Sequence, residues 1–238
     1  AEINRILDKL RRSGKLASIY RDWGIWDDRQ TRLQQTDYKA RAVYANQGGN
    51  GWGIYLPVLF KGALMTCAIS VSAMFLAIVL GLLLTLLRLA GGKVLKYLAI
   101  GYIEAIRGTP LLLQLYIVYY GLPSVGINLS AFTAAVLALG MNYAASEAEI
   151  YRAGLESIPK GQTEAALSLG MTTSMIYRRI LIPQAVKVVL PPSTNDFISL
   201  FKDSSLVSVI AIVELTKSYN MLAVSSMRFL ELGFLTAA

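Results

Sequence analysis

The absence of charged residues over long stretches decides which kind of protein this sequence can form. Lys61 and Arg88 enclose 26 consecutive uncharged residues, positions 62–87, and no charge falls between Arg107 and Glu147. About 20 apolar residues are enough for a helix to cross the hydrocarbon core of a bilayer, so the chain has room for several spans. The period-2 pattern of a transmembrane β-barrel is absent. These features predict an all-α membrane protein.

The apolar stretches predict five spans: about Tyr55–Leu87, Tyr97–Gly121, Leu129–Glu149, Arg179–Leu200, and a last one from about Arg228. The second is expected to break near Gly108–Pro110 and the fourth to bend at Pro191 and Pro192. The stretch DSSLVSVIAIVEL, at 203–215, is too short to span and is predicted to form either a surface helix or a re-entrant one. The last span stops at Ala238, so we expect the natural chain to continue.

The first 50 residues differ from the rest because they carry ten of the 23 Lys and Arg residues, mixed with six acidic ones. Apolar residues recur there at helical spacing on both sides of Gly14, which predicts two short amphipathic helices and then a flexible linker at 46–54. The pattern opens in mid-helix at Ala1, so we expect a piece of a longer polypeptide. The net charge of +8 is divided between this part and the span ends, and it predicts no nucleic-acid partner.

Several kinds of chemistry are excluded by what the sequence lacks. There is no histidine and Cys67 is the only cysteine, so imidazole bases, histidine metal ligands and intrachain disulfides are ruled out. No phosphate-binding glycine loop ending in Lys and Ser or Thr occurs, so ATP and Mg²⁺ have to be bound by a partner chain. We expect no catalytic residue, no metal site and no cofactor in this chain, which argues against an intramembrane enzyme.

The basic residues between the spans predict how the chain crosses the membrane. The connection after the first span contains Arg88, Lys93 and Lys96, and the connection after the third span is basic as well. The connection after the second span has no Lys or Arg. Basic connections stay on the cytoplasmic side, so both of these are predicted to be cytoplasmic and the N-terminus to lie outside.

Residues 158–178 are a polar, helix-prone segment between the third and fourth spans. Strong helix formers fill Thr163–Leu169, Gly170 is placed to end that helix, and residues 172–174 offer an N-cap for a second one. Such a pair of helices on the cytoplasmic side can dock onto a soluble partner and transmit force. The alternative is an amphipathic helix that lies on the lipid surface.

The stretches EAALSLG, at 164–170, and ILIPQA, at 180–185, resemble the EAA signature of permease subunits in ATP-binding-cassette (ABC) importers. In that family the signature lies in a loop docked into a cleft on the ATPase. The resemblance implies a type I ABC importer-like permease with about five transmembrane helices and a cytoplasmic coupling helix, so residues 158–178 are called the coupling segment below. The residues that match the signature are Glu164, Ala165, Ala166, Gly170 and Pro183.

Three further stretches resemble the polar amino-acid branch of that family, and the resemblance covers the chain from about Tyr55 onward. They are RGTPLLLQLYIVYYGLP at 107–123, AEIYRAGLESIPKGQ at 148–162, and LFKDSSLVSVIAIVELT at 200–216, where Ser204 replaces a usual threonine. The resemblance implies transport of basic amino acids or of glutamine and glutamate. It also implies two ABC ATPase subunits, a second permease copy in a homodimer or pseudo-dimer, and a place in the bacterial inner (plasma) membrane.

The stretch INRILDKLRRSGKLASIYRDWG, at 3–24, is similar to the closing helices of periplasmic-type amino-acid-binding proteins. This similarity implies that residues 1–45 are the C-terminal remnant of an extracytoplasmic substrate-binding domain. Residues 46–54 would then link that domain to a transmembrane permease domain at 55–238. The alternative is an ordinary amphipathic N-terminal extension.

Polar side chains inside the predicted spans are candidates for the substrate pathway, because burying them in hydrocarbon costs energy. The candidates are Gln114, Asn142, Ser146, Glu147, Glu149, Asn195 and Asp196. For each of them hydrogen bonding between helices is an equal alternative. Glu104 and Arg107 are expected to pair with each other, and Lys202 and Asp203 to form a surface pair or an external gate.

The acids among these candidates suit a cationic amino acid such as arginine or lysine. They suit equally the α-ammonium group that every amino acid carries. Asn142, Ser146 and Glu149 lie close to one helical face, and Glu147 about a third of a turn away. We therefore expect the membrane subunit of an ATP-driven importer of polar amino acids. The alternative is an ion-coupled secondary amino-acid transporter, a class that usually has internal repeats, which are not evident here.

Overall fold

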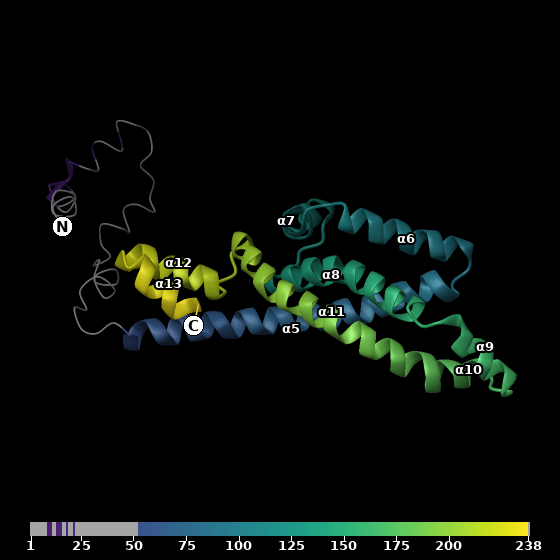
Figure 1. The fold of residues 1–238 in the computed structure, drawn as a ribbon. Coiled ribbons are helices and arrows are strands. Elements are labelled where there is room, and N and C mark those ends of the chain that lie inside the picture. The colour runs from purple at the N-terminus through teal and green to yellow at the C-terminus, as the bar shows by residue number, and fades with distance from the viewer. Residues whose placement is uncertain (1–8, 11–12, 16–17, 19–20, 22–51, 238) are drawn as a thin grey trace. The chain divides into compact units, whose positions relative to one another are not determined.

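The computed structural model describes residues 9–10, 13–15, 18, 21 and 52–237, and it divides the chain into two compact units, Ala1–Gly51 and Trp52–Ala238 (Figure 1). In the first unit Gly14 has a φ of 74° and lies in a turn between helical residues. Most of the two predicted N-terminal helices, and the predicted linker up to Gly51, lie outside the described residues. The elements from α5 onward all belong to the second unit.

The longest element is α5 (Trp52–Ala90), which contains the predicted first span. Its 39 residues make a helix about 58 Å long, which exceeds the roughly 30 Å hydrocarbon core of a bilayer. Within the described part of the chain, α5 is the one helix that is long and apolar enough to cross a membrane by itself. Phe60, Phe75 and Leu86 are exposed along it, as lipid-facing side chains would be.

The predicted second span consists of separate helices. α6 (Lys93–Arg107) ends at Gly108, and α7 (Leu111–Tyr116) begins directly after Pro110, so the predicted break is confirmed. A proline at this position cannot donate a backbone hydrogen bond, and it restricts the residue before it to extended conformations. The chain continues through a π-turn, η1 (Ile117–Gly121), and a 3-10 turn, η2 (Leu122–Val125).

The third span extends further than predicted. It is α8 (Ala131–Glu156), seven residues longer at its C-terminal end than the sequence pattern suggested, and Ser130 caps its first turn by accepting a hydrogen bond from the N–H of Thr133. The remaining elements are α9 (Lys160–Ser168), α10 (Thr173–Ile176), the π-turn η3 (Tyr177–Leu181), α11 (Ile182–Asp203), the 3-10 helix η4 (Ser204–Ile210), α12 (Leu215–Ser226) and α13 (Phe229–Ala237).

The core forms where small residues let α5 and α8 approach closely. Ala73 and Ala77 of α5 and Ala138 and Ala144 of α8 are buried. A Cβ added at Gly81 of α5 would lie 2.8 Å from the Cβ of a residue on α8 and 3.2 Å from a backbone oxygen there. Such contacts between small residues are the usual way in which membrane helices pack.

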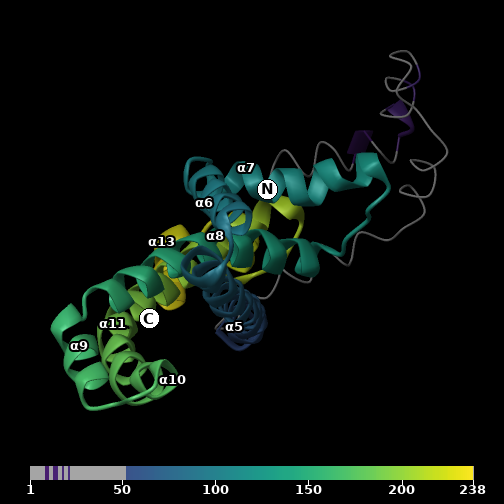
Figure 2. The ribbon, with the colours of Figure 1, turned by 90° about the vertical axis from the view of Figure 1, so that its right-hand side faces the viewer.

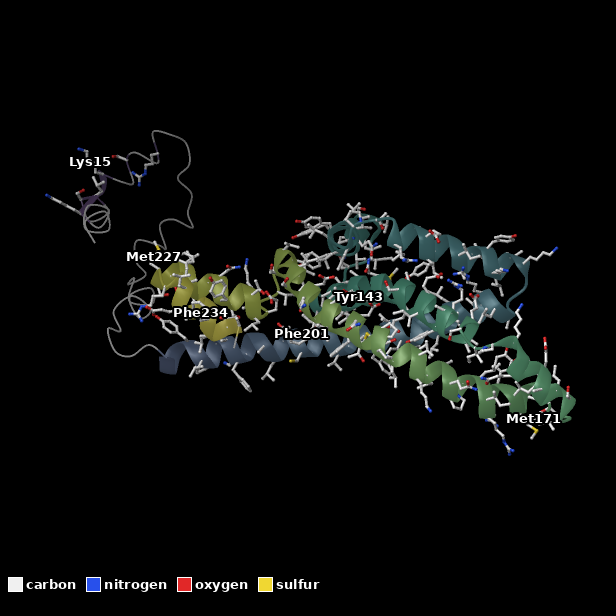
Figure 3. The ribbon with its side chains drawn as sticks, in the orientation of Figure 1. Lys15, Tyr143, Met171, Phe201, Met227 and Phe234 are labelled. Atoms are coloured by element: carbon white, nitrogen blue, oxygen red, sulfur yellow. The ribbon has the colours of Figure 1, made fainter. Side chains whose placement is uncertain are left out.

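The two ends of this unit have different structures. α9 and α10 project together from the ends of α8 and α11 (Figures 1 and 2), and Met171 marks this end in Figure 3. At the opposite end α12 and α13 pack on the start of α5 through buried Leu59, Leu222 and Leu232. The coupling segment is therefore separated from α13 by the length of the helical unit.

Two sequence-based expectations are refined: one of the two alternatives for residues 203–215 is favoured, and a predicted ion pair is corrected. The 203–215 stretch is no surface helix, because Val207 and Ile210 of η4 are fully buried in the main core, which favours the re-entrant alternative. No ion pair joins Glu104 to Arg107 among the described residues, whose ion pairs lie elsewhere. Both of those side chains are exposed, where such a pair gains little free energy.

A third expectation is corrected at the end of α11. Asp203 does not pair with Lys202 in the described part of the chain. Its carboxylate instead accepts a hydrogen bond from the hydroxyl of Tyr143, 2.8 Å away on α8. The contact joins two spans in the same region as the buried η4, so Asp203 is a link between helices. The predicted bend at Pro191 and Pro192 does not interrupt α11, which is continuous through both prolines.

Candidate functional site

The coupling segment folds into two short helices joined at Gly170. Gly170 has a φ of 74°; its N–H donates to the carbonyl oxygen of Leu167 at 2.9 Å, and the N–H of Met171 donates to that of Ala166 at 3.1 Å. These bonds satisfy carbonyl groups that a helix end leaves unpaired. Any residue with a side chain is strained at this φ by roughly 1–2 kcal/mol. Thr172 then caps α10 with its side-chain oxygen, so the predicted helix end and N-cap are both confirmed.

A π-turn makes room for the proline of the EAA signature. Pro183 lies in the first turn of α11, directly after η3 (Tyr177–Leu181). In an ordinary α-helix its ring would crowd the carbonyl of Arg179, four residues earlier, and it has no N–H to donate to that carbonyl. In the π-turn the N–H of Ile182 instead donates to the carbonyl of Tyr177, five residues earlier.

The residues of the EAA signature divide between the surface and the interior of the hairpin. Glu164 and Ala165 are exposed, whereas Ala166 is only 2% exposed. The side chain of Gln184 on α11 donates a hydrogen bond to that of Gln162 on α9. The buried face and this hydrogen bond attach α9 to the base of α11, and the other face presents a carboxylate beside a small residue to the surroundings.

The amide network consists of Gln114, Thr109 and Asn142. The Nε2 of Gln114 lies 2.8 Å from the carbonyl oxygen of Ile106 and 2.7 Å from the hydroxyl of Thr109, and its Oε1 accepts from the Nδ2 of Asn142 at 3.1 Å. Both polar atoms of this buried side chain are therefore partnered. The network ties the break between α6 and α7 to α8 and satisfies backbone groups that the break leaves free.

The acidic cluster consists of Glu147, Ser193 and Asp196, from α8 and α11. Glu147 is fully buried; its Oε2 accepts a hydrogen bond from the Ser193 hydroxyl at 2.8 Å. In the part of the chain that the structure describes, Glu147 Oε1 and the buried Asp196 Oδ2 have no partner. The two carboxylates are close enough to repel each other. No ion pair among the described residues includes either of them, and burying two acids without a cation is costly.

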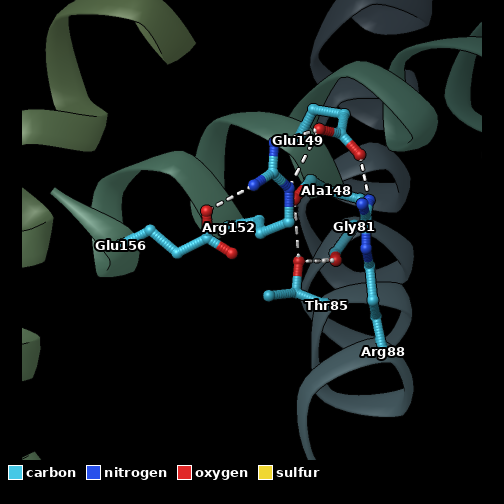
Figure 4. Close-up of polar contacts among 7 residues, drawn as sticks. All are labelled: Gly81, Thr85, Arg88, Ala148, Glu149, Arg152 and Glu156. Carbon is cyan, nitrogen blue, oxygen red and sulfur yellow. Dashed lines mark hydrogen bonds and ion pairs between the residues drawn. The ribbon is translucent and has the colours of Figure 1, made fainter. Parts of the chain in front are cut away.

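Glu149 has a different environment from Glu147, although both were predicted as pathway residues. Its carboxylate is bound by Arg88 of α5 and by Arg152 of α8, and Arg152 also pairs with Glu156 (Figure 4). These four residues are called the ion-pair network below.

The last two predicted pathway residues directly precede Glu147 and Asp196 in the chain. Ser146 is half-buried on α8, and Asn195 is exposed on α11. Sequence reasoning missed Ser193 and Arg88, whose partners lie 46 and 61 positions away in the chain. Arg152 could have been found, because it follows Glu149 by one helical turn.

Comparison with known proteins identifies the family. Residues 77–236 match the family described as "Binding-protein-dependent transport system inner membrane component". The matched range covers about two thirds of the chain and includes the coupling segment and α11. The chain belongs to this family. The permease is therefore a membrane-embedded component of an ABC importer, which implies ATPase partners and a pair of permease subunits.

Similar proteins carry names that agree with the family. The permease is 40% identical over 161 residues to "L-cystine transport system permease protein TcyB" of Bacillus subtilis (strain 168), covering 68% of this chain and 69% of that protein. It is 37% identical over 177 residues to "Arginine transport system permease protein ArtQ" of the same organism, covering 74% and 81%. Both are named as permeases, which are transport components and not enzymes.

A solved structure shows the same fold. The match to "Crystal structure of an amino acid ABC transporter with histidines" has a TM-score of 0.73 and 41% sequence identity, and it covers 79% of this chain and 87% of that one. The predicted fold class, an all-helical type I ABC permease, is thus confirmed. No observation favours the ion-coupled alternative.

Proposed function

We propose that this permease is the translocation subunit of an ATP-driven importer of polar amino acids, and that a partner ATPase moves it through the coupling segment. The observation that carries the proposal is the exposed pair Glu164 and Ala165, on a compact hairpin whose other face is fixed to the permease. Relatives named for cystine and arginine transport support the substrate class. The proposal assigns the ATPase-coupling role to Glu164, Ala165, Ala166, Gly170 and Pro183.

Each of these residues has a physical reason for its role. Glu164 offers a charge to the ATPase surface, and the methyl group of Ala165 lets that surface approach closely. Buried Ala166 holds α9 against the rest of the hairpin, and Gly170 supplies the left-handed turn between α9 and α10. Pro183 sets the start of α11, so a displacement of α9 is passed to α11 as well as to α8.

The transport cycle follows from these connections. When ATP closes the two ATPase subunits, the coupling segments they hold are displaced, and α8 and α11 are displaced with them. The spans then change from inward-open to outward-open, because binding of the closed ATPase is more favourable in that state. ATP and Mg²⁺ are bound by the ATPase chains, and this chain needs no cofactor of its own.

The proposed orientation places the coupling segment in the cytoplasm and the N-terminus outside. Basic residues support it, because Arg88, Lys93 and Lys96 lie at the junction of α5 and α6, and Lys160 opens α9. The bacterial inner (plasma) membrane is the proposed location, which agrees with the family description.

The proposed substrate pathway runs beside the acidic cluster. Glu147 and Asp196 each have an oxygen without a partner among the residues that the structure describes, so they are the residues assigned to the cationic group of the substrate. Ser146 and Asn195, on the same two helices, are assigned to its polar groups. Gln114, Asn142 and Glu149 already have partners in the amide and ion-pair networks, so for them the proposal favours hydrogen bonding between helices.

The proposed assembly contains two permease copies, in a homodimer, and two ATPase subunits. Residues 1–45 are proposed to be the end of an extracytoplasmic substrate-binding domain, with 46–54 as a linker and 55–238 as the permease domain. The similarity of residues 3–24 to amino-acid-binding proteins supports this arrangement. A fused receptor would keep the substrate close to the external opening of the pathway.

The test is uptake by the complete transporter in proteoliposomes, with labelled arginine, glutamine and cystine and with ATP inside or absent. We expect ATP-dependent uptake of at least one of the three, and its loss in Glu164→Lys. The matched control is Glu231→Lys on α13, at the opposite end, whose pair with Arg228 is exposed and contributes at most about 1 kcal/mol. Uptake that needs no ATP, or that Glu164→Lys leaves unchanged, would contradict the proposal.

A further inference from the structure

The ion-pair network alternates in charge near the C-terminal ends of α5 and α8 (Figure 4). Arg88 binds one oxygen of Glu149, and Arg152 binds the other through its Nη2 at 2.8 Å and its Nε at 3.1 Å. Arg152 also donates from its Nη1 to Glu156. Both oxygens of Glu149 are therefore used, by arginines from two different helices.

The inner part of this network is shielded from water and its outer end is not. The side chains of Arg88, Glu149 and Arg152 are 22%, 20% and 26% exposed, whereas that of Glu156 is 57% exposed. An ion pair on the open surface contributes little, but removing one partner from a shielded pair leaves the other charge uncompensated. Of the three ion pairs in the network, the one between Arg88 and Glu149 joins α5 to α8, whereas the other two lie within α8, so this pair adds a charged link to the packing of the two helices.

A neutral contact reinforces the network one turn away. The hydroxyl of Thr85 on α5 lies 2.8 Å from the carbonyl oxygen of Gly81 and 3.1 Å from that of Ala148 on α8 (Figure 4). Gly81 lets the helices approach closely enough for this contact, because a side chain there would meet the backbone of α8. Charged and neutral contacts thus fix the same point of the α5–α8 interface.

The network leads directly to the coupling segment. Glu156 is the last residue of α8, and Pro159 precedes the first residue of α9. The pair between Arg152 and Glu156 spans the final turn of α8, so it stiffens the helix where α9 pulls on it. A force on α9 therefore reaches α8 at the residues that are bound to α5.

We infer that Arg88, Glu149 and Arg152 are positioning residues of the transport cycle, which make the end of α5 move with the end of α8 when the coupling segment is displaced. This inference rests on the proposed function. Without the pair between Arg88 and Glu149, the ATPase would still close and move α8, but α5 would follow incompletely. ATP would then be hydrolysed without a matching amount of transport. A purely stabilising ion pair would lower both activities together.

The experiment measures ATP hydrolysis and amino-acid uptake in the same proteoliposomes, using labelled arginine, glutamine or cystine, whichever the unmodified transporter takes up. For Arg88→Met we expect the number of molecules transported per ATP to fall about 5-fold or more, because coupling free energies of this kind change equilibria by that factor. Arg88→Lys, which keeps the charge, is expected to recover at least half of the ratio. The control is Arg228→Met, which removes an exposed pair on α13 and should leave the ratio unchanged.

Thr85→Val provides a second variant should Arg88→Met fail to assemble, because it keeps the shape of the side chain and removes only the hydroxyl. We expect a fall of about 2-fold in the same ratio. The inference would be overturned if the assembled variants transported the same number of molecules per ATP as the unmodified transporter. This holds both when uptake and ATP hydrolysis fall together and when neither falls. Failure of the proposed function would be recognised separately, because the unmodified transporter would then show no ATP-dependent uptake or Glu164→Lys would have no effect.

Discussion

Two buried polar groups on neighbouring helices, Gln114 and Glu147, differ in how completely they are partnered. The amide of Gln114 makes hydrogen bonds with both of its polar atoms. The carboxylate of Glu147 is more deeply buried, and one of its oxygens has no partner in the described part of the chain. A group with all its partners inside the chain holds the fold together, whereas one that lacks a partner is suited to receive a ligand.

The largest effect is expected for Glu147→Gln, which tests this distinction directly. The change keeps the size of the side chain and removes its charge, so uptake should fall by about 100-fold, as when one member of a buried charged pair is lost. Stability should stay the same or rise, because an uncompensated carboxylate is removed. Uptake and thermal unfolding in detergent would be measured together. Normal uptake by this variant would remove Glu147 from the pathway.

The opposite outcome is expected for Gln114→Leu. The change removes the hydrogen-bond partner of the Asn142 amide and one of the donors to the carbonyl of Ile106, which Thr109 also contacts. It should lower the free energy of unfolding by about 2 kcal/mol. Uptake per folded molecule should be kept. Asn142→Leu, which loses one of these hydrogen bonds, is the milder control. A stable Gln114→Leu protein without transport would reverse the assignment and make Gln114 a pathway residue.

A smaller effect on stability is expected in the coupling segment, where it arises from backbone conformation and not from hydrogen bonds between side chains. Gly170→Ala should destabilise the permease by about 1 kcal/mol, because Gly170 has a φ of 74°. Gly161→Ala is a matched control in the same segment. A side chain there meets nothing within 4 Å, and alanine favours the helix by about 1 kcal/mol. Unfolding midpoints that shift in the same direction for both variants would contradict the structure of the hairpin.

The smallest effect is expected for Glu231→Gln. Its pair with Arg228 is 3.6 Å long and both side chains are more than half exposed, so its loss should change the free energy of unfolding by less than about 0.5 kcal/mol. The free energy of unfolding would be measured at low and high salt. The small difference expected for this exposed ion pair is the reference for the buried groups above. A loss as large as that for Gln114→Leu would show that exposure is a poor guide to these energies.

Features that depend on neighbouring residues were predictable from the sequence. The end of α9 at Gly170, the cap at Thr172 and the break at Gly108–Pro110 follow from local preferences for backbone conformation, and the structure has all three. The span defined by hydropathy alone, α5, is present as well. Each of these depends on a few consecutive residues or on a simple average.

Features that depend on distant partners were not predictable. Asn142 and Glu149 lie close to one helical face, yet they are two turns apart along α8, so one meets Gln114 and the other Arg88. Spacing by i and i+3 suggested a pair between Glu104 and Arg107, but it does not reveal that both remain exposed. Sequence periodicity gives the face of a helix, and it contains no information on which helix lies opposite.

The π-turn η3 has a consequence for the register of the chain. Tyr177–Leu181 contain one residue more than an α-helical turn would hold. A chain shorter by that residue would close into a regular helix, and α10, which is continuous with it, would be rotated by about 100° around the helix axis relative to α11. The face that α10 presents relative to α11 is therefore set by a single additional residue.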